Sequence, residues 1–450
     1  MKIILWGTGG IFKKYKSYIS FSNVEALVDN DKKKWGTQIE GITVISPMQL
    51  EEYIYDYIII MAVKYQEIRA QLQHMGVNSN KIIDKEHQGI FQNIIIQKKY
   101  KILEIANKKG KVALISHTLD RTGAPLVLFN LAKVLIGAGY EVDVYSFGAD
   151  CLVNDFLQLG ISVTMYANDN LNEKYCIETF SHYDVIWVNT LVIYGVVNIL
   201  KKIGKPVIWW LHEEEDYMQK CLNEGMCIEV YESLSIYGVG GRVKETFNKN
   251  YPYIKCGLLP YGIATVNEGE KIEHTKLVFA IIGSVCKRKG QDILIQAINE
   301  MENKWKDVAE FWIIGSITKN RKEEYEKCSL VKVLGEKSHS EVMELYKHID
   351  VVVCPSLNDP LPVVVAEGMQ QKKVCIVSDM TGMAIFISQY EDGLVCEADN
   401  PTSLKDCIQW VIDNTDKIEN IGENAYKIYE KNFAMESFKN RIIDIMREIE

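Results

Sequence analysis

Short apolar runs of strand length alternate with longer segments of helical period along almost the whole chain of 450 residues. The runs start with KIILWG near the N-terminus and end with GLVCEAD near the C-terminus. This alternation is typical of βαβ units, in which crossover helices join parallel strands. The sequence therefore predicts an α/β protein built from doubly wound parallel sheets.

Breaks in this pattern divide the chain into three units. Residues 1–95 are predicted to form a small Rossmann-like domain, and a helix with a basic end, over residues 91–111, follows it. Residues 110–268 and 275–432 are predicted to form two larger domains, because the polar segment TVNEGEKIEHT between them has the composition of a hinge. Residues 433–450 are expected to form a C-terminal helix that packs back on the second unit.

The strands expected in each unit can be read directly from the apolar runs. They are KIILWG, VEALVD, YDYIIIMAV and KIID in the first unit, KVALISH, EVDVYSF, ISVTMYA, DVIWVNT, KPVIWWLH and IYGVGG in the second, and KLVFAIIGS, EFWIIGS, VKVLG, DVVVCPS, KVCIVSD and GLVCEAD in the third. Two linked doubly wound domains create a cleft, and ligands bind outside the carboxyl ends of the strands. Functional residues are therefore expected just after strands of the second and third units.

Composition excludes several classes of function. A net charge of -9 offers no basic surface for nucleic acid. The 11 cysteines are scattered singly, without Cys-x-x-Cys or Cys/His zinc spacing, which favours a reduced cytoplasmic compartment and no metal site. The longest apolar stretch, VIWVNTLVIYGVVNIL, is interrupted by polar residues and is predicted to be a strand followed by a helix. Attachment to the inner face of a membrane is compatible with the sequence but not required by it.

The segment NDPLPVVVAEGMQQ places two carboxylates, Asp359 and Glu367, next to an apolar strand. Pro362 suits the first turn of a helix through VVVAEGMQQ, and the free N–H groups of that turn can bind an anion such as phosphate. Glu367, more than one turn into the helix, can accept hydrogen bonds from a vicinal diol such as ribose. The alternative is that Glu367 is a paired helix residue and Asp359 a turn former.

A basic turn follows the first strand of the third unit. In IIGSVCKRKGQDILIQAI, Arg288 and Lys289 precede Gly290, a residue that lets backbone approach closely. Cations in this position suit a diphosphate. The alternative is a solvated basic loop.

Two features of the second unit point towards the same cleft. Thr122-Gly123-Ala124 connects a strand to a helix, with Pro125 expected at the first helical position, so backbone and helix dipole face a ligand. His212 ends the strand KPVIWWL, where an imidazole can bind a substrate hydroxyl. A plain turn and a structural histidine are the respective alternatives.

The first unit contains a partial dinucleotide fingerprint. WGTGGIF follows the first strand and supplies Gly7, Gly9 and Gly10, and Asp29 lies at a suitable distance for a ribose contact. Phe12 occupies the third glycine position, which argues against NAD. Asp29-Asn30-Asp31 also resembles a metal-binding Asp-x-Asp motif, but a turn after the second strand is the simpler explanation. These residues remain the predicted ligand loop of an accessory domain.

With these segments in place, residues 111–432 resemble the family 4 glycosyltransferases, which have the two-domain GT-B fold. PSLNDPLPVVVAEGM resembles the E-x7-E segment of the family, and GSVCKRKGQDILIQA resembles its basic loop. WWLHE, RTGAPLVLFNLA and SDMTGMAIFI match further family segments in the same order. The first unit lies outside this match and looks like the small domain that begins some sugar-modifying transferases, where it holds a nucleotide-sugar.

The resemblance implies a role for each matched residue. Arg288 and Lys289 would bind the donor diphosphate, Glu367 the ribose, Asp359 the sugar hydroxyls, and His212 would position the sugar near the reacting carbon. The remaining donor-binding positions implied are Gly123, Ala124, Pro362, Thr381 and Gly382. This sequence departs from the family pattern at three positions. Ser284 stands where the family often has arginine, Asp359 where it has glutamate, and Tyr261 where it often has asparagine.

The resemblance implies transfer of a sugar, with retention of configuration and no required cofactor or metal, from a nucleoside-diphosphate sugar to a glycan or lipid-linked glycan acceptor. A cytoplasmic hexosyltransferase that acts in cell-surface polysaccharide or glycoconjugate synthesis fits this description. Two alternatives stay open. One is a non-catalytic partner that binds nucleotide-sugars or glycans, and the other is an NAD-linked sugar-modifying enzyme that uses the first domain.

Overall fold

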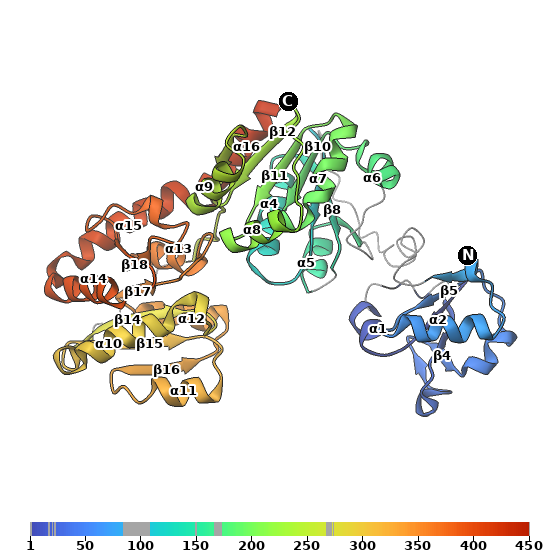
Figure 1. Ribbon diagram of the computed structural model, residues 1–450, viewed down its shortest axis with the longest axis horizontal. Coiled ribbons are helices and arrows are strands. Elements are labelled where there is room, and N and C mark those ends of the chain that lie inside the picture. The colour runs from blue at the N-terminus through green and yellow to red at the C-terminus, as the bar shows by residue number, and fades with distance from the viewer. Residues whose placement is uncertain are drawn as a thin grey trace. The chain divides into compact units, whose positions relative to one another are not determined.

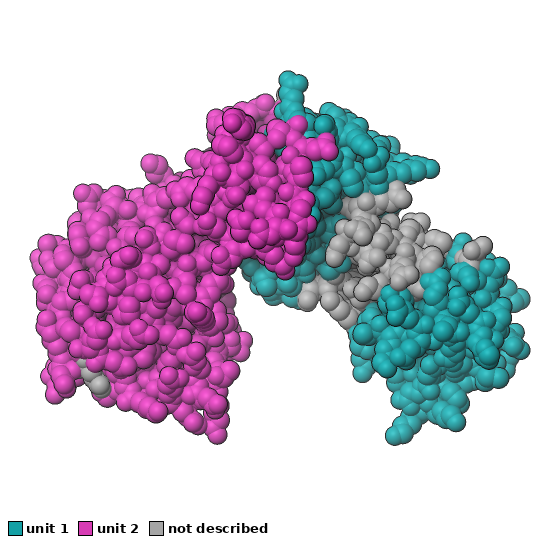
Figure 2. Space-filling model, viewed as in Figure 1, with its two compact units in different colours: residues 1–208, 231–234 teal, residues 209–230, 235–450 magenta. Residues whose placement is uncertain are grey.

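The computed structural model describes residues 2–16, 19, 21, 24–83, 109–148, 151–165, 173–266, 272 and 274–449. The helix predicted over residues 91–111 and most of the predicted hinge lie outside these residues. The chain divides into two compact units (Figure 2), one formed by residues 1–208 and 231–234 and the other by residues 209–230 and 235–450.

The N-terminal sheet has six strands in the order β3-β4-β2-β1-β5-β6 (Figure 1). The strands are β1 (Ile3–Trp6), β2 (Val24–Val28), β3 (Gln38–Ile39), β4 (Ile42–Ile45), β5 (Tyr57–Ile60) and β6 (Ile82–Ile83). The helices are α1 (Gly10–Tyr15) and α2 (Tyr65–His74), with short 3-10 turns η3 (Lys32–Lys34), η4 (Pro47–Glu52) and η5 (Ser79–Lys81). All four predicted strands are confirmed, and their pairing is parallel. The antiparallel β3–β4 hairpin was not predicted, because polar residues interrupt its apolar runs, as Thr43 does in β4.

Strand β1 shows why this sheet is covered on both faces. Ile3 and Leu5 belong to one apolar cluster, whereas Ile4 and Trp6 belong to another. Successive side chains of a strand point to opposite faces, so an unbroken apolar run fits a strand buried on both sides.

The second sheet has seven strands in the order β13-β12-β11-β10-β7-β8-β9. Its strands are β7 (Gly110–Ser116), β8 (Tyr140–Ser146), β9 (Ser162–Met165), β10 (Val185–Asn189), β11 (Val207–Leu211), β12 (Leu234–Gly238) and β13 (Cys256–Leu258). Its helices are α4 (Gly123–Gly137), α5 (Leu152–Gln158), α6 (Glu173–Phe180), α7 (Tyr194–Leu200), α8 (Glu215–Asn223) and α9 (Gly241–Asn250), with 3-10 turns η6 (Leu191–Ile193) and η7 (Lys201–Ile203). The six predicted strands are confirmed, and only the short edge strand β13 was missed. The longest apolar stretch is a strand followed by a helix, β10 and α7, as predicted. Among the described residues, no helix has both the length and the apolar character needed to cross a bilayer.

The third sheet has six parallel strands in the order β16-β15-β14-β17-β18-β19. Its strands are β14 (Leu277–Ile282), β15 (Ala309–Ile314), β16 (Val331–Gly335), β17 (Val351–Cys354), β18 (Val374–Ser378) and β19 (Leu394–Cys396). Its helices are α10 (Gln291–Trp305), α11 (Lys319–Tyr325), α12 (His339–Leu345), α13 (Val363–Gln370), α14 (Pro401–Asp413) and α15 (Ile418–Asn432), with 3-10 turns η8 (Lys287–Lys289), η9 (Tyr346–His348), η10 (Ala384–Phe386) and η11 (Thr415–Lys417). A last helix, α16 (Met435–Ile449), follows α15 and contacts β11 of the second sheet. All six predicted strands are confirmed. The central strands β17 and β18 are buried along their whole length, which holds the loops at their carboxyl ends on a rigid base.

Two helix ends are well defined in the structure. Ser338 and Glu341 form a capping box at the start of α12. Helix α16 lies in the predicted C-terminal segment. The ring of its Phe438 stacks on Trp210 at a centroid distance of 5.7 Å, and Arg441 donates to the carbonyl of Pro260.

Candidate functional site

A basic turn lies between β14 and α10, at the carboxyl end of the sheet. Turn η8 carries Arg288 and Lys289 and ends at Gly290, which has a φ of 74°. A side chain at Gly290 would overlap the carbonyl oxygen of Pro355, so only glycine fits both the conformation and the space. Backbone also links this turn to the next loop, since Leu357 N–H donates to Arg288 O at 2.8 Å.

The two cations of this turn meet two carboxylates. Lys289 Nζ lies 2.6 Å from Asp359 Oδ2, and Arg288 lies 3.6 Å from the same oxygen. Arg288 also pairs with Glu214 at 2.9 Å. Asp359 is only 5% exposed, and a buried carboxylate requires such partners. Burial raises the pKa of Glu214, while the nearby Arg288 opposes that shift.

The loop that follows β18 closes against Asp359. Thr381 forms an isolated β-bridge with Asp359, and Gly382 N–H donates to the Asp359 carbonyl at 2.8 Å. Side chains at Gly240 or Gly382 would each overlap the carbonyl oxygen of Pro360. Three backbone segments therefore meet at Pro360, and this contact fixes the direction of the Asp359 side chain.

The Pro-Leu-Pro turn ends at the start of α13. Pro362 is the residue before the first helical position, with φ -70° and ψ 115°, one position earlier than the sequence predicted. The hydroxyl of Tyr261 donates to the carbonyl of Leu361. Burial, together with the nearby Asp359 and Glu367 carboxylates, raises the pKa of Tyr261 well above 10.0, so the hydroxyl remains a donor. The Tyr261 hydroxyl thus stabilises the Pro-Leu-Pro turn through this hydrogen bond.

Glu367 lies in the second turn of α13 and is 7% exposed. Its Oε1 lies 2.8 Å from His339 Nε2, and its Oε2 accepts from the Tyr346 hydroxyl at 3.4 Å. Tyr346 also donates to Val364 O at 2.9 Å. In the structure, Glu367 is therefore a paired helix residue.

The His339–Glu367 pair leads to a prediction for pH. The hydrogen bond to Glu367 raises the pKa of His339 above 6.5, although partial burial opposes it. A group with a raised folded pKa stabilises the fold below its unfolded pKa and loses this contribution as pH rises through the folded pKa. We expect wild type to be more stable than His339→Gln at about pH 5.5, and the difference to shrink by about pH 9. Thermal unfolding of both proteins at the two pH values measures this difference in stability. A difference that grows with pH would contradict a raised pKa of His339 in the fold.

His212 follows β11, as predicted, and lies in the same compact unit as Lys289 and Asp359. Its ring lies 4.9 Å from that of Trp210, and its backbone N–H donates to Glu213 at 2.9 Å. Two residues further on, Glu214 reaches Arg288. The segment after β11 therefore approaches the basic turn.

Gly123 and Ala124 belong to the other compact unit. They are the first two residues of α4, so the prediction of Pro125 at the first helical position is wrong. The reason is that Leu126 N–H donates to Thr122 O at 3.2 Å, which starts the helix two residues earlier. Pro125 still lies in the first turn, where its missing N–H leaves no intrahelical hydrogen bond broken. Asn189, at the end of β10, donates to Ala124 O at 3.2 Å and holds the loop in place.

In the N-terminal sheet, the predicted turn at Asp29-Asn30-Asp31 is confirmed. Asp29 Oδ1 accepts the N–H of Asp31 at 2.9 Å, and Oδ2 accepts from Thr8 and Lys34. Within the described residues, no group of three or more His, Cys, Asp or Glu side chains is arranged to hold a metal ion. Phe12 is 1% exposed and packs in the core, where its ring meets Phe21 at 6.3 Å.

Sequence reasoning missed three groups at the larger site. Glu214 lies in the acidic run after His212, but nothing in that run distinguishes the carboxylate that pairs with Arg288. His339 lies inside the recognised capping box, yet its contact with Glu367 joins residues 28 positions apart. The role of Gly240 could not be predicted, because a Gly-Gly pair after a strand is common in ordinary turns.

Two parts of the chain match family models of glycosyltransferases. Residues 264–428 match the family model described as glycosyl transferases group 1, and residues 108–227 match glycosyl-transferase family 4. Residues 1–83 match a separate model, described as C2185-like, N-terminal.

Relatives with these domains are found among curated proteins. The chain is 25% identical over 346 residues to the glycosyltransferase MJ1607 of Methanocaldococcus jannaschii, a match that covers 67% of this chain and 88% of that protein. It is 24% identical to the spore coat protein SA of Bacillus subtilis, over 77% of this chain and 98% of that protein. A match at 30% identity to the glycosyltransferase MJ1178 of M. jannaschii covers 34% of this chain and 43% of that protein.

Solved structures share the fold at low sequence identity. Anabaena Alr3699/HepE in complex with UDP has a TM-score of 0.60 at 17% identity, with 75% of this chain and 100% of that chain covered. The sucrose-phosphate synthase of Thermosynechococcus elongatus has a TM-score of 0.61 at 16% identity, over 76% and 99% of the two chains. The predicted GT-B fold, with parallel α/β sheets in several Rossmann-like domains, is confirmed.

Proposed function

We propose that this chain, a glycosyltransferase of the GT-B fold with family 4 domains, transfers a sugar from a nucleoside-diphosphate sugar to a glycan or lipid-linked glycan acceptor with retention of configuration. The observation that carries the proposal is the pairing of Lys289 and Arg288 with Asp359 and Glu214 at the carboxyl ends of the strands. A diphosphate offers the same cations a stronger, more highly charged partner.

Donor binding in this proposal is an exchange of partners. The diphosphate replaces Glu214 on Arg288 and shares Lys289 with Asp359, so that the Asp359 carboxylate becomes able to accept from sugar hydroxyls. As the bond to the leaving phosphate breaks, negative charge grows on the diphosphate, and the two cations stabilise it. The N–H groups at the start of α13, after Pro362, contribute to the same charge.

The remaining residues position the donor. Glu367 accepts from the ribose hydroxyls, and Thr381 with Gly382 approaches the donor from the loop after β18. His212 positions the sugar near the reacting carbon. Gly123 and Ala124 remain donor-binding positions that the family resemblance implies. The donor phosphate takes the proton of the acceptor hydroxyl, because no side chain in the described part of this site is placed as a separate base.

The acceptor-side domain then spans residues 110–268 and the donor domain residues 275–432, with residues 433–450 returning to the acceptor side. A lipid-linked acceptor in polysaccharide synthesis would bring the protein to the inner face of the membrane.

The direct test is a panel of UDP-, GDP-, ADP- and CMP-sugars with purified full-length protein, followed by thermal shift and by release of free nucleoside diphosphate. UDP-sugars come first, because a structural neighbour was solved in complex with UDP and glucose. Transfer or hydrolysis of one donor supports the proposal, and NMR of the product anomer tests retention. Tight donor binding without turnover, at every acceptor tried, would favour a non-catalytic binding partner. Stabilisation by NAD alone would overturn the proposal that the chain is a sugar transferase.

The role proposed for Glu367 gives a separate prediction. Replacing Glu367 by Gln keeps the size of the side chain and removes its charge, so KM for the active donor should rise about tenfold with a smaller change in kcat. The 2'-deoxy form of the same donor should be bound weakly by wild type and no more weakly by the variant. Equal losses for the ribose and deoxyribose donors would show that Glu367 acts on folding and not on the diol.

A further inference from the structure

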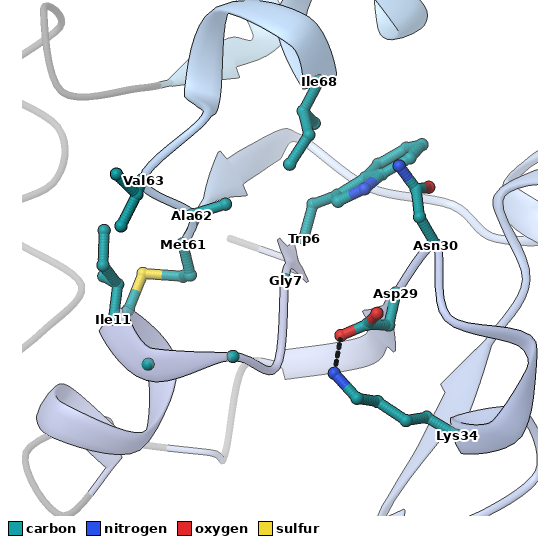
Figure 3. A pocket seen from close by; sticks show the side chains of 12 residues that line it. Trp6, Gly7, Ile11, Asp29, Asn30, Lys34, Met61, Ala62, Val63 and Ile68 are labelled. Atoms are coloured by element: carbon teal, nitrogen blue, oxygen red, sulfur yellow. Dashed lines mark hydrogen bonds and ion pairs between the residues drawn. The ribbon is translucent and has the colours of Figure 1, made fainter.

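A second cavity, remote in sequence from the residues above, lies in the N-terminal sheet (Figure 3). It has a volume of about 220 Å³, and its walls come from the segments that follow β1, β2 and β5. In the strand order β3-β4-β2-β1-β5-β6, the chain leaves β1 towards β2 on one side and later returns to β5 on the other. The boundary between β1 and β5 is therefore the topological switch point, where open α/β sheets bind ligands.

The wall after β2 carries a charged pair. Asp29 is 8% exposed, and Lys34 Nζ lies 2.8 Å from its Oδ2. Burial alone would raise the pKa of Asp29, but hydrogen bonds from Lys34 and Thr8 bring it down to about 2, so the carboxylate stays charged. Each carboxylate oxygen can accept two hydrogen bonds, and Oδ1 accepts one, from Asp31. Oδ1 can therefore take a ligand hydroxyl, while the ammonium of Lys34 has donors left for an anion.

The wall formed by β1 contains an orphan donor. The Trp6 side chain is 0% exposed, lines the cavity, and its indole N–H has no acceptor among the described residues. A buried donor without a partner is unfavourable, and an acceptor atom of a ligand would remove that cost. The opposite wall is apolar, with Met61, Ala62 and Val63 after β5 and Ile68 in α2 (Figure 3).

The floor of the cavity is bare backbone. Gly7 has a φ of 106°, and a side chain there would lie 2.9 Å from the carbonyl oxygen of Met61, so glycine is required for the turn. At Gly9 and Gly10 the space beyond the backbone is open, with no atom within 4 Å of an added Cβ. A ligand can therefore approach the main chain directly at both positions.

We propose that this cavity binds a ribonucleoside 5'-diphosphate group, with a ribose hydroxyl on Asp29, phosphate beside Gly9, Gly10 and Lys34, and the base against the apolar wall. An acceptor atom of the ligand meets the Trp6 N–H. This site is separate from the donor site at Lys289, so the chain has two nucleotide sites. The same group occurs in nucleotide-sugars and in NAD, and titration with each compound distinguishes which of them binds.

The test is titration calorimetry on the full-length chain with UDP, GDP, ADP, UDP-glucose and NAD. It is carried out in the Lys289→Ala background, which weakens the donor site. Gly9→Leu adds a side chain at the cavity floor, at a position where an added Cβ has no atom within 4 Å. Lys34→Ala removes the cation, and Lys33→Ala in the same turn is the matched control. Trp6→Phe removes only the N–H and part of the ring.

The expected result is one remaining nucleotide site in Lys289→Ala, with affinity reduced at least about tenfold by Gly9→Leu or Lys34→Ala and unchanged by Lys33→Ala. Trp6→Phe should weaken the same site several-fold, about as much as the loss of one hydrogen bond. Thermal unfolding without ligand should be nearly unchanged in Gly9→Leu, so that lost binding is not lost folding. Absence of binding by every compound, or binding indifferent to both Gly9→Leu and Lys34→Ala, would overturn the proposal. Sugar transfer by Gly9→Leu is expected to match wild type, which separates this outcome from the test of the donor site.

Discussion

Replacing Lys289 with alanine should lower kcat/KM for the sugar donor by about two to three orders of magnitude, the largest catalytic effect expected in this chain. The ammonium lies 2.6 Å from Asp359, and the proposed diphosphate must share it. Its removal takes away a charge that stabilises the leaving group. Among the described residues, it also leaves the buried Asp359 with Arg288, at 3.6 Å, as its one remaining cationic ion-pair partner. Both effects act against donor binding and bond cleavage.

The control for this variant lies in the same turn. Lys287 precedes the two functional cations, is exposed, and should tolerate alanine with less than a twofold change in kcat/KM. Steady-state kinetics on the active donor, with thermal unfolding of both variants, measures the two outcomes. Similar losses at Lys287 and Lys289 would indicate a general effect of charge around the site. An unchanged kcat/KM in Lys289→Ala would show that the basic turn has no role in the mechanism.

Gly382→Ala is expected to cause the largest loss of stability, with a decrease of about 10 °C in the unfolding midpoint of the unit that contains it. A Cβ at this position would overlap the carbonyl oxygen of Pro360 and lie close to Gly240. The three backbones cannot separate without moving Asp359, because Gly382 N–H donates to the Asp359 carbonyl. Activity should therefore fall together with stability.

A glycine in open surroundings supplies the control. Gly195, inside α7, has no atom within 4 Å of an added Cβ, so Gly195→Ala should raise the unfolding midpoint slightly by reducing the entropy of the unfolded chain. Scanning calorimetry resolves both changes. If Gly382→Ala unfolded at the wild-type temperature and kept full activity, the close contact at Pro360 would not exist in solution.

Much of the fold was predictable because it depends on local patterns. Strands such as β17 and β18 are buried on both faces, so they appear in the sequence as unbroken apolar runs. The β3–β4 hairpin and β13 escaped prediction because polar residues or glycine interrupt their apolar runs, as Thr43 does in β4 and Gly257 in β13. The start of α4 was misplaced by two residues because Pro125 is tolerated throughout a first helical turn.

For the candidate site, the sequence alone determined which residue types follow which strands. It identified Arg288, Lys289, Asp359 and Glu367 as the charges at the carboxyl ends of the third sheet, since parallel strands bring those ends to one edge. Only the tertiary structure decided how these charges pair. The pairing of Glu214 with Arg288 and of His339 with Glu367 joins residues 74 and 28 positions apart, and such distances leave no periodic trace in a sequence. The same holds for the N-terminal cavity. Its glycines and Asp29 were visible in the sequence, whereas packing alone decided that the buried N–H of Trp6 has no acceptor among the described residues.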